Sequence, residues 1–200
     1  MTKRDEREAM ARATLEGSSA ALARAAETLP EAVAAAAGKI EEALRAGGKV
    51  LLCGNGGSAA DAQHIAAELA GRLKLERRGL AALALTVNAS VLTALSNDYG
   101  YAAVFARQVE AVGRRGDVLV AISTSGASEN VVAALARARE LGLATIGFSG
   151  EAGGAMAEHC DLLIRAPGGD TQRTQEVHIA AGHAICEIVE AELFGSEAAE

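Results

Sequence analysis

From Lys49 onward, the hydrophobic residues of this chain occur in short continuous runs that alternate with longer segments of helical periodicity. The clearest run is 118–122, Val-Leu-Val-Ala-Ile, which contains no polar residue. Runs of this kind are typical of strands buried on both faces, as in a parallel sheet with helices on either side. The pattern therefore predicts an α/β fold, with strands at 49–53, 81–86, 117–122, 143–148 and 161–165 and helices at 58–70, 88–96, 102–113, 128–141 and 171–194.

The residues before this alternation predict two helices. The first, at 2–28, carries one narrow apolar stripe among many alanines, and Pro30 opens a second helix at about 31–46. The stripe either covers the core of its own chain or packs against another subunit. We favour another subunit, because a long helix outside the α/β repeat needs a surface on which to bury its stripe. The stripe consists of Met10, Leu15, Leu22 and Leu29.

Composition narrows the classes of partner. A chain of 200 residues fits one domain with a sizeable core. The formal net charge of −7 argues against a nucleic-acid surface, and the absence of Trp leaves little for stacking on bases. There is no uncharged apolar run long enough to span a membrane and no signal-peptide-like apolar segment near the N-terminus. Three scattered cysteines, Cys53, Cys160 and Cys186, form no CxxC pair and indicate a reducing compartment. We therefore expect a soluble, cytoplasmic protein.

A glycine-rich turn follows the first predicted strand and precedes a helix. The turn, 54–58, reads Gly-Asn-Gly-Gly-Ser and can offer backbone N–H groups to an anion. His64 and Glu68 lie four residues apart on the helix, so they share one face about one turn apart. The segment predicts a metal-ligand or acid/base pair close to a site for a phosphorylated small molecule.

A second turn, 123–128, reads Ser-Thr-Ser-Gly-Ala-Ser and directly follows the strand predicted at 117–122. Its four hydroxyl groups can surround a phosphate with O–H and N–H donors. Ser128 could instead be the N-cap of the next helix, but capping needs one hydroxyl and not four. Phosphate binding is therefore favoured. The turn contains neither a Walker lysine nor a GxGxxG motif, which disfavours a nucleoside triphosphate or a dinucleotide.

The predicted C-terminal helix carries Gln175 and His183, two turns apart on roughly one face. An unpaired imidazole in the apolar turn around His183 would be costly, so we expect a specific partner for it. His178 points about 140° away from His183, and its role is open between packing and function. Gln175 and His183 are separated by about 12 Å of helix rise, so they can meet His64 and Glu68 either within one chain or from a neighbouring subunit.

Taken together, these motifs resemble those of the phosphoheptose (sedoheptulose 7-phosphate) isomerases, a family of the sugar isomerase (SIS) domain superfamily. The Ser-Thr-Ser-Gly turn is shared across SIS domains, whereas the combination of His64 and Glu68 with Gln175 and His183 is more specific. The resemblance extends from the N-terminal helix to Phe194. It rests on 54–58, on Asp61-Ala62-Gln63-His64 with Glu68, on Ser96-Asn97-Asp98-Tyr99-Gly100, on 123–126, and on Gln175-Glu176-Val177-His178 with His183.

The resemblance implies a five-stranded parallel sheet in a three-layer α/β/α sandwich. Residues 1–195 would form a single SIS domain, with the helices of 2–46 used in oligomerisation and a short tail at 196–200. The family further implies a homotetramer and one Zn²⁺ ion per subunit, and we expect the active sites to lie near the subunit interfaces. It implies conversion of sedoheptulose 7-phosphate to D-glycero-D-manno-heptose 7-phosphate, the first step of bacterial heptose biosynthesis.

The resemblance also implies roles for individual residues. Glu68 and His183 would be the acid/base pair, and His64, Glu68, Gln175 and His183 would hold the metal. Moving a carbonyl from C2 to C1 requires one group that removes a carbon-bound proton and another that handles the proton on oxygen. We favour Glu68 as base and His183 as acid, although the sequence alone leaves the two assignments open. The residues implied for substrate binding are Asn55, Gly56, Gly57, Ser58, Asp61, Arg72, Asn97, Asp98, Ser123, Thr124, Ser125, Ser128 and Gln175.

Two other functions compete with the isomerase. A non-catalytic SIS-domain tetramer that binds the DnaA replication initiator shares the fold and the glycine-rich turns. Such relatives tend to lack the full set of acid/base and ligand residues, all of which this chain contains. A sugar-phosphate sensor would bind the ligand without turnover.

Overall fold

At the centre of the computed structural model lies a five-stranded, all-parallel sheet in the order β2-β1-β3-β4-β5. The structure describes residues 2–195, so the tail expected at 196–200 lies outside the described residues. β1 and β3, at the middle of the sheet, are buried along their whole length, as the continuous apolar runs predict. The strands are β1 (Val50–Gly54), β2 (Ala82–Ala84), β3 (Val118–Ser123), β4 (Ala144–Gly150) and β5 (Leu162–Ala166).

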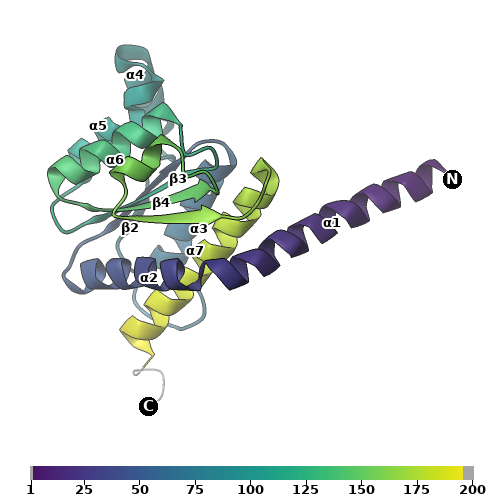
Figure 1. Cartoon of the computed structure of the whole chain (residues 1–200). Coiled ribbons are helices and arrows are strands. Elements are labelled where there is room, and N and C mark those ends of the chain that lie inside the picture. Colours follow the sequence, from purple (N-terminus) through teal and green to yellow (C-terminus); the bar gives the residue numbers. More distant parts are fainter. Residues whose placement is uncertain (1, 196–200) are drawn as a thin grey trace.

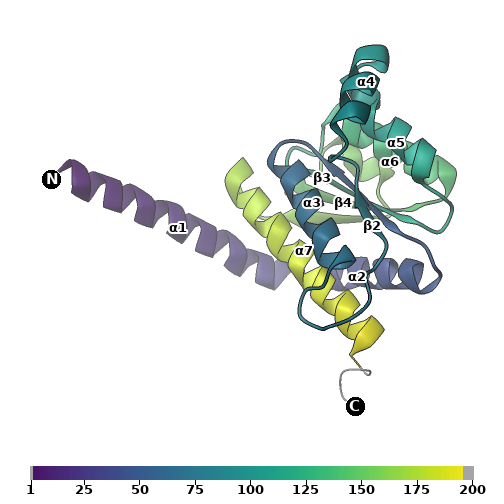
Figure 2. The same cartoon turned by 180° about the vertical axis from the view of Figure 1, so that it is seen from behind.

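Helices cover both faces of the sheet and give the molecule three layers (Figures 1 and 2). α2, α3 and α7 pack on one face with strand residues such as Leu52 and Val120. α5 and α6 pack on the other face, against neighbouring strand residues such as Leu51 and Leu119. This alternation confirms the predicted three-layer α/β/α class. The helices are α1 (Lys3–Thr28), α2 (Pro30–Arg45), α3 (Gly57–Ala70), α4 (Ala89–Tyr99), α5 (Val104–Val112), α6 (Glu129–Leu141) and α7 (Thr171–Phe194), with short 3₁₀ turns η1 (Tyr101–Ala103) and η2 (Ala155–His159).

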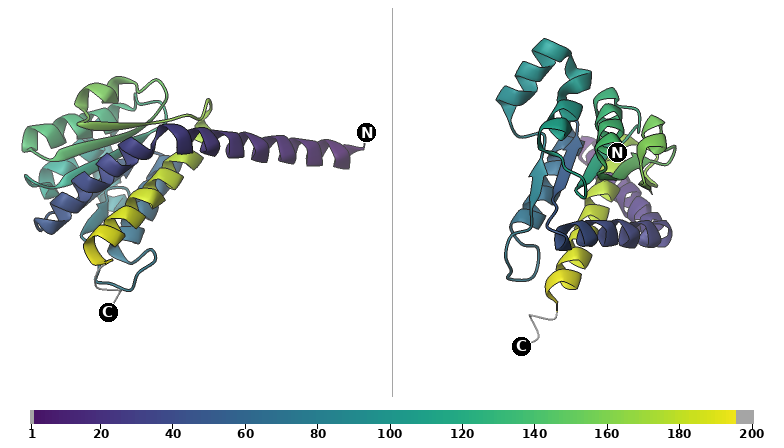
Figure 3. Two further views of the ribbon diagram at one scale, coloured as in Figure 1. Left: turned by 60° about the horizontal axis from the view of Figure 1, so that its bottom comes forward. Right: turned by 90° about the vertical axis from the view of Figure 1, so that its left-hand side faces the viewer.

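The long helix α1 extends away from the body of the domain (Figures 1 and 3). Its first turn is fixed by a capping box, in which the side chain of Thr2 accepts from the N–H of Asp5 and the Asp5 carboxylate accepts from the N–H of Thr2. Met10 and Leu15 are 74% and 70% exposed, and Ala21 is the one buried residue along the described helix. The N-terminal part of the apolar stripe is therefore not covered by its own chain.

Element boundaries agree with the predictions to within three residues, and β2 and α4 show two of the differences. β2 is shorter than the predicted strand 81–86, because it lies at the edge of the sheet and pairs with β1 alone. α4 begins after Asn88, whose side chain accepts from the N–H of Val91, and it continues to Tyr99 instead of ending at 96. The helix predicted at 102–113 begins with the 3₁₀ turn η1 before α5.

The sheet topology brings the two predicted ligand turns together. β1 and β3 are parallel neighbours with Gly54 opposite Ile122, so the turns at 55–58 and 123–128 leave the same edge of the sheet side by side. α7 lies along α3 on one face of the sheet (Figure 2). Among residues 2–195, no helix is both long and apolar enough to cross a membrane.

Candidate active site

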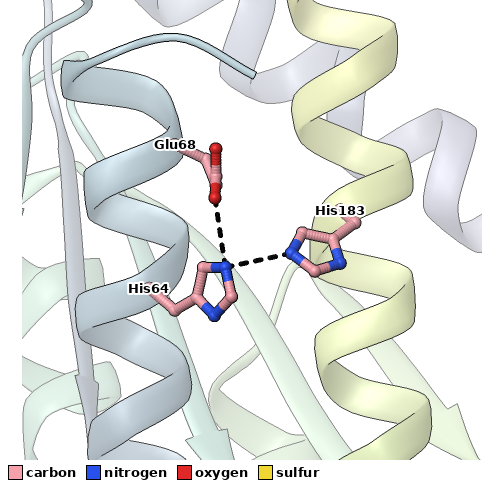
Figure 4. A group of neighbouring side chains, drawn as sticks. All are labelled: His64, Glu68 and His183. Atoms are coloured by element: carbon pink, nitrogen blue, oxygen red, sulfur yellow. Dashed lines mark hydrogen bonds and ion pairs between the residues drawn. The ribbon is translucent and has the colours of Figure 1, made fainter. Parts of the chain in front are cut away.

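His64 and Glu68 on α3 meet His183 on α7 (Figure 4). The helical spacing places the Nε2 atom of His64 3.1 Å from Oε1 of Glu68. The Nε2 atom of His183 lies 3.1 Å from Nε2 of His64, with the two rings in an edge-to-face arrangement. The partner expected for His183 is therefore His64 of the same chain.

The three side chains form a donor set that could hold a divalent cation. One ligand atom from each of His64, Glu68 and His183 lies within 4.8 Å of the other two. Two imidazole nitrogens and one carboxylate oxygen are ligands that Zn²⁺ prefers. A single proton on Nε2 of His64 would have to serve both the carboxylate and the second imidazole, whereas a cation would satisfy all three atoms. The donor set thus fits the Zn²⁺ ion that the family resemblance implies.

A cavity of about 280 Å³ opens between the two turns that follow β1 and β3. Residues from both turns line it, together with the start of α7, so it collects hydroxyl, amide and backbone groups at the N-terminal ends of helices. Such a place favours an anion. Its lining residues are Asn55, Gly56, Gly57, Ser58, Ile122, Ser123, Thr124, Ser128, Thr171 and Gln175.

The serines of the second turn converge on one another. The Oγ atom of Ser123 lies 3.0 Å from that of Ser128 and 3.4 Å from that of Ser125. Ser128 is the N-cap residue of α6, but its side chain makes no capping hydrogen bond. Its hydroxyl is directed at Ser123 instead, which favours the anion-binding interpretation over simple capping.

Asn55 is held in place by two residues to which the sequence analysis gave no role. Its amide exchanges two hydrogen bonds with the amide of Asn130, at 2.8 and 2.9 Å, and its oxygen also accepts from the hydroxyl of Tyr101 at 2.9 Å. Asn130 is buried at the start of α6. A buried amide needs hydrogen-bond partners, and Asn55 supplies them for Asn130.

Gln175 lies beside the first turn. A Cβ atom added at Gly57 would lie 2.5 Å from the side-chain nitrogen of Gln175, so the glycine makes room for this amide. Gln175 also lines the cavity with the serines. Its expected role as a fourth metal ligand stays a prediction.

Asp61 lies one turn before His64 on α3 and has an unusual environment. Its Oδ2 atom is buried and has no hydrogen-bond partner among the described residues. Burial raises the pKa of the Asp61 carboxyl to about 6, against the smaller opposing effect of His64. A buried carboxylate oxygen without a donor suits a ligand hydroxyl.

Three other predicted binding residues lie at the surface of the chain. Arg72 follows α3 and pairs with Glu76 at 3.4 Å. Asn97 donates to the carboxylate of Asp98 at 2.9 Å on α4, which projects from the body and has no buried residue (Figure 1). Within the described residues of one chain, these three side chains do not line the cavity between the turns. Their roles stay predictions.

His178 has a structural environment. It is fully buried, its Nε2 lies 3.0 Å from the carbonyl oxygen of Ser149, and its ring packs edge-on against Phe148. Burial lowers its pKa, against the opposing effect of the hydrogen bond to Ser149, so the ring is neutral and donates from Nε2. His178 and His183 thus point to different places, as predicted, and the packing interpretation of His178 is the supported one.

The fold and the paired turns define the class of protein. A family model described as the SIS domain matches residues 15–150, so this chain is a SIS-domain protein.

Comparison with known proteins narrows the class further. The chain is 57% identical over 171 residues to the phosphoheptose isomerase of Roseiflexus sp. (strain RS-1), covering 86% of this chain and 87% of the relative. It is 59% identical over 159 residues to that of Rhodospirillum rubrum, covering 80% and 85%. The solved phosphoheptose isomerase GmhA of Neisseria gonorrhoeae superposes with a TM-score of 0.88 at 44% identity, covering 92% and 98%. The chain belongs to the phosphoheptose isomerase family.

Proposed function

We propose that this protein is an aldose–ketose isomerase that converts sedoheptulose 7-phosphate to D-glycero-D-manno-heptose 7-phosphate, the first step of bacterial heptose biosynthesis. The convergence of His64, Glu68 and His183 carries the proposal. It supplies a carboxylate and imidazoles on α3 and α7, the two helices whose first residues help to line a hydroxyl-rich cavity, in a chain that belongs to the phosphoheptose isomerase family. The alternative functions, binding of DnaA or ligand sensing without turnover, do not account for this acid/base set.

The reaction moves hydrogen within the substrate and needs no external oxidant. Glu68 removes the proton from C1 and returns it to C2, while His183 gives a proton to O2 as the O1–H proton is lost. The intermediate is an enediol(ate). Proton transfers of this kind by positioned groups are typically worth about 10²–10⁴-fold in rate. The buried oxygen of Asp61 is available for a further polar contact with the sugar.

The same residues suit a metal cofactor. We propose one Zn²⁺ per subunit, held by His64, Glu68 and His183, with the amide oxygen of Gln175 as fourth ligand. When bound, the zinc ion supplies Lewis-acid stabilisation of negative charge that develops on oxygen.

Substrate binding divides between the two turns. The second turn would bind the phosphate, because its hydroxyl groups converge beside the N-terminus of α6. The first turn would contact the sugar through Asn55 and Ser58, with the backbone close at Gly56 and Gly57. The phosphate residues proposed are Ser123, Thr124, Ser125 and Ser128, and further sugar contacts are proposed for Asp61, Arg72, Asn97, Asp98 and Gln175.

We further propose a homotetramer with active sites near the subunit interfaces, in the cytoplasm. The uncovered stripe on α1 supports this assembly, as does an apolar groove of about 370 Å³ lined by residues such as Leu22, Val33 and Ile188. Light scattering should give the mass of four chains, and Leu15→Glu should lower it. A wild-type monomer would contradict the assembly.

The central test is a coupled assay with sedoheptulose 7-phosphate on protein prepared with and without zinc. Turnover is expected, with the greater rate in the zinc-loaded protein. Binding of the substrate without turnover in either preparation would favour the sensor. Tight binding of purified DnaA by an inactive protein would favour the scaffold.

A further inference from the structure

A buried ion pair connects the loop after α3 with α7. Nε of Arg77 donates to Oε1 of Glu190 at 2.8 Å, and the two side chains are 1% and 2% exposed. Nη2 of Arg77 donates to the carbonyl of Glu68 at 2.9 Å, and Nη1 donates to that of Leu69 at 3.0 Å. These carbonyls belong to the last turn of α3, where C=O groups have no N–H donor further along the helix. The negative end of the helix dipole also favours a cation there. Arg77 therefore caps the helix that carries His64 and Glu68.

Glu190 organises the same loop from the other side. Its Oε1 accepts from the N–H of Leu73 at 3.0 Å, and its Oε2 accepts from the N–H groups of Lys74 and Leu75 at 2.7 and 2.9 Å. Burial acts to raise the pKa of Glu190, but these three N–H donors and Arg77 outweigh it and lower the pKa to about 2. The carboxylate is charged and saturated with donors, so the loop has one well-defined position against α7.

The pair lies close to the candidate acid/base residues without being able to contact the substrate. Glu190 follows His183 by seven residues, which is about two turns on the same face of α7. Arg77 binds the backbone of Glu68 itself. Because both side chains are buried, any effect on the reaction must act through the two helices.

We infer that the Arg77–Glu190 pair positions α3 against α7 so that Glu68, His64 and His183 keep the separation that the isomerisation requires. The inference rests on the proposed function, since it assigns to the pair a role in that reaction. Loss of residues that orient ligands or acid/base groups typically costs about 10–100-fold in metal affinity or activity. Displacement of a reacting group by about 1 Å can cost about 10²-fold.

Glu190→Gln tests the inference, with Asp117→Asn as a matched control. Like Glu190, Asp117 is a buried carboxylate that accepts from a cation, Lys49, and from backbone N–H groups, here those of Lys49 and Arg114. It lies at the opposite end of the sheet, before β3, so its loss should destabilise the fold without moving the site. Arg77→Lys is the second variant, because lysine keeps the charge but lacks the planar guanidinium with which Arg77 reaches the carboxylate and the two carbonyls from three separate nitrogens.

Each variant is compared with wild type for kcat, for KM and for Zn²⁺ affinity, the last measured with the metal alone against a chelator. Glu190→Gln should lose about 10–100-fold in both kcat and Zn²⁺ affinity, and Arg77→Lys about tenfold, with KM changed by less than about threefold. Asp117→Asn should change each of these values by less than about threefold.

Several results would overturn the inference. One is a folded Glu190→Gln protein with wild-type kcat and Zn²⁺ affinity. Another is an equal loss in Asp117→Asn, which would make the effect one of general stability. If Glu190→Gln fails to fold, wild-type values in Arg77→Lys would have the same consequence. If wild type itself shows no turnover, the proposed function fails, and the Zn²⁺ affinities alone decide whether the pair positions the site.

Discussion

The Nε2 atom of His183 lies 3.1 Å from the Nε2 atom of His64, although 119 residues separate them in the chain. The neighbouring position on α7 explains how the two helices come so close. A Cβ atom at Gly182 would lie 2.6 Å from Cδ1 of Ile65, the residue after His64. The contact of the two imidazoles therefore depends on the absence of a side chain at Gly182.

We expect Gly182→Ala to separate α3 from α7. Overpacking of a filled contact costs about 1–3 kcal/mol. Alanine recovers about 1 kcal/mol through its helix propensity. The cost of overpacking exceeds this gain, so the free energy of unfolding should fall, and kcat should fall by about tenfold or more because the acid/base groups move apart. Urea denaturation and steady-state kinetics measure the two effects.

Gly38→Ala on α2 is the control for this substitution. Gly38 is also a helical glycine, but it is exposed and a Cβ there would meet nothing within 4 Å. This variant should be more stable than wild type by up to about 1 kcal/mol and should keep its kcat. A Gly182→Ala protein that behaves like Gly38→Ala would show that the helices do not need this close approach.

Glu68→Gln should abolish most of the turnover while substrate binding persists. The amide keeps the size of the side chain but cannot take a proton from carbon, so we expect kcat to fall by about 10²–10⁴-fold. Calorimetric titration with substrate should give an affinity close to that of wild type. Glu187→Gln, at an exposed position on α7 paired with Lys74, is the control. A kcat for Glu68→Gln within a few-fold of wild type would remove Glu68 from the role of base.

Ser125→Ala should raise KM far more than it lowers kcat. The hydroxyl of Ser125 accepts from the N–H of Ala127 and lies 3.4 Å from that of Ser123, so it belongs to the converging set at the second turn. Phosphate binding is largely the same in the ground state and the transition state, and its loss appears in KM. Ser18→Ala on α1, where the hydroxyl binds the carbonyl of Thr14, should change neither constant. A fall in kcat alone would place Ser125 in the chemical step.

The sequence could predict those features that depend on local pattern. The apolar run at 118–122 and the turn after it lie where they were expected, because a buried parallel strand and the hydroxyl-rich end that follows it are both encoded in consecutive residues. His64 and Glu68 share a face because helical spacing requires it.

Features that depend on tertiary contacts could not be predicted in this way. Asn55 and Asn130 are 75 positions apart, and Arg77 and Glu190 are 113 positions apart. Nothing in the local sequence at either member identifies the other. The choice between an intrachain and an intersubunit partner for His183 was likewise open, because it depends on how closely α7 packs on α3.

The stability contributed by Glu190 should depend on pH in a specific direction. The pKa of its carboxyl falls from the ordinary value of 4.5 to about 2 on folding. Because the pKa is lower in the folded state, the ionised carboxyl stabilises the fold at any pH above its pKa in the unfolded chain. This contribution is lost as pH falls from about 4.5 toward 2. At 1.36 kcal/mol per pKa unit, the shift corresponds to about 3 kcal/mol. Removal of one partner from a buried ion pair typically costs about 3–5 kcal/mol, in agreement.

A glutamine does not titrate. The difference in the free energy of unfolding between wild type and Glu190→Gln therefore measures this contribution. Denaturant unfolding at equal protein concentration should show the variant less stable than wild type by several kcal/mol at pH 7. The difference should narrow as pH falls below about 4.5, because the carboxyl of the unfolded wild type then takes up a proton while the folded protein still holds it ionised, whereas the variant has no such group. Glu187→Gln, at its exposed position, should stay within about 0.5 kcal/mol of wild type throughout. A difference between wild type and Glu190→Gln that is the same at pH 7 and pH 3 would contradict the lowered pKa, and would mean that Glu190 stabilises the loop by its shape and not by its charge.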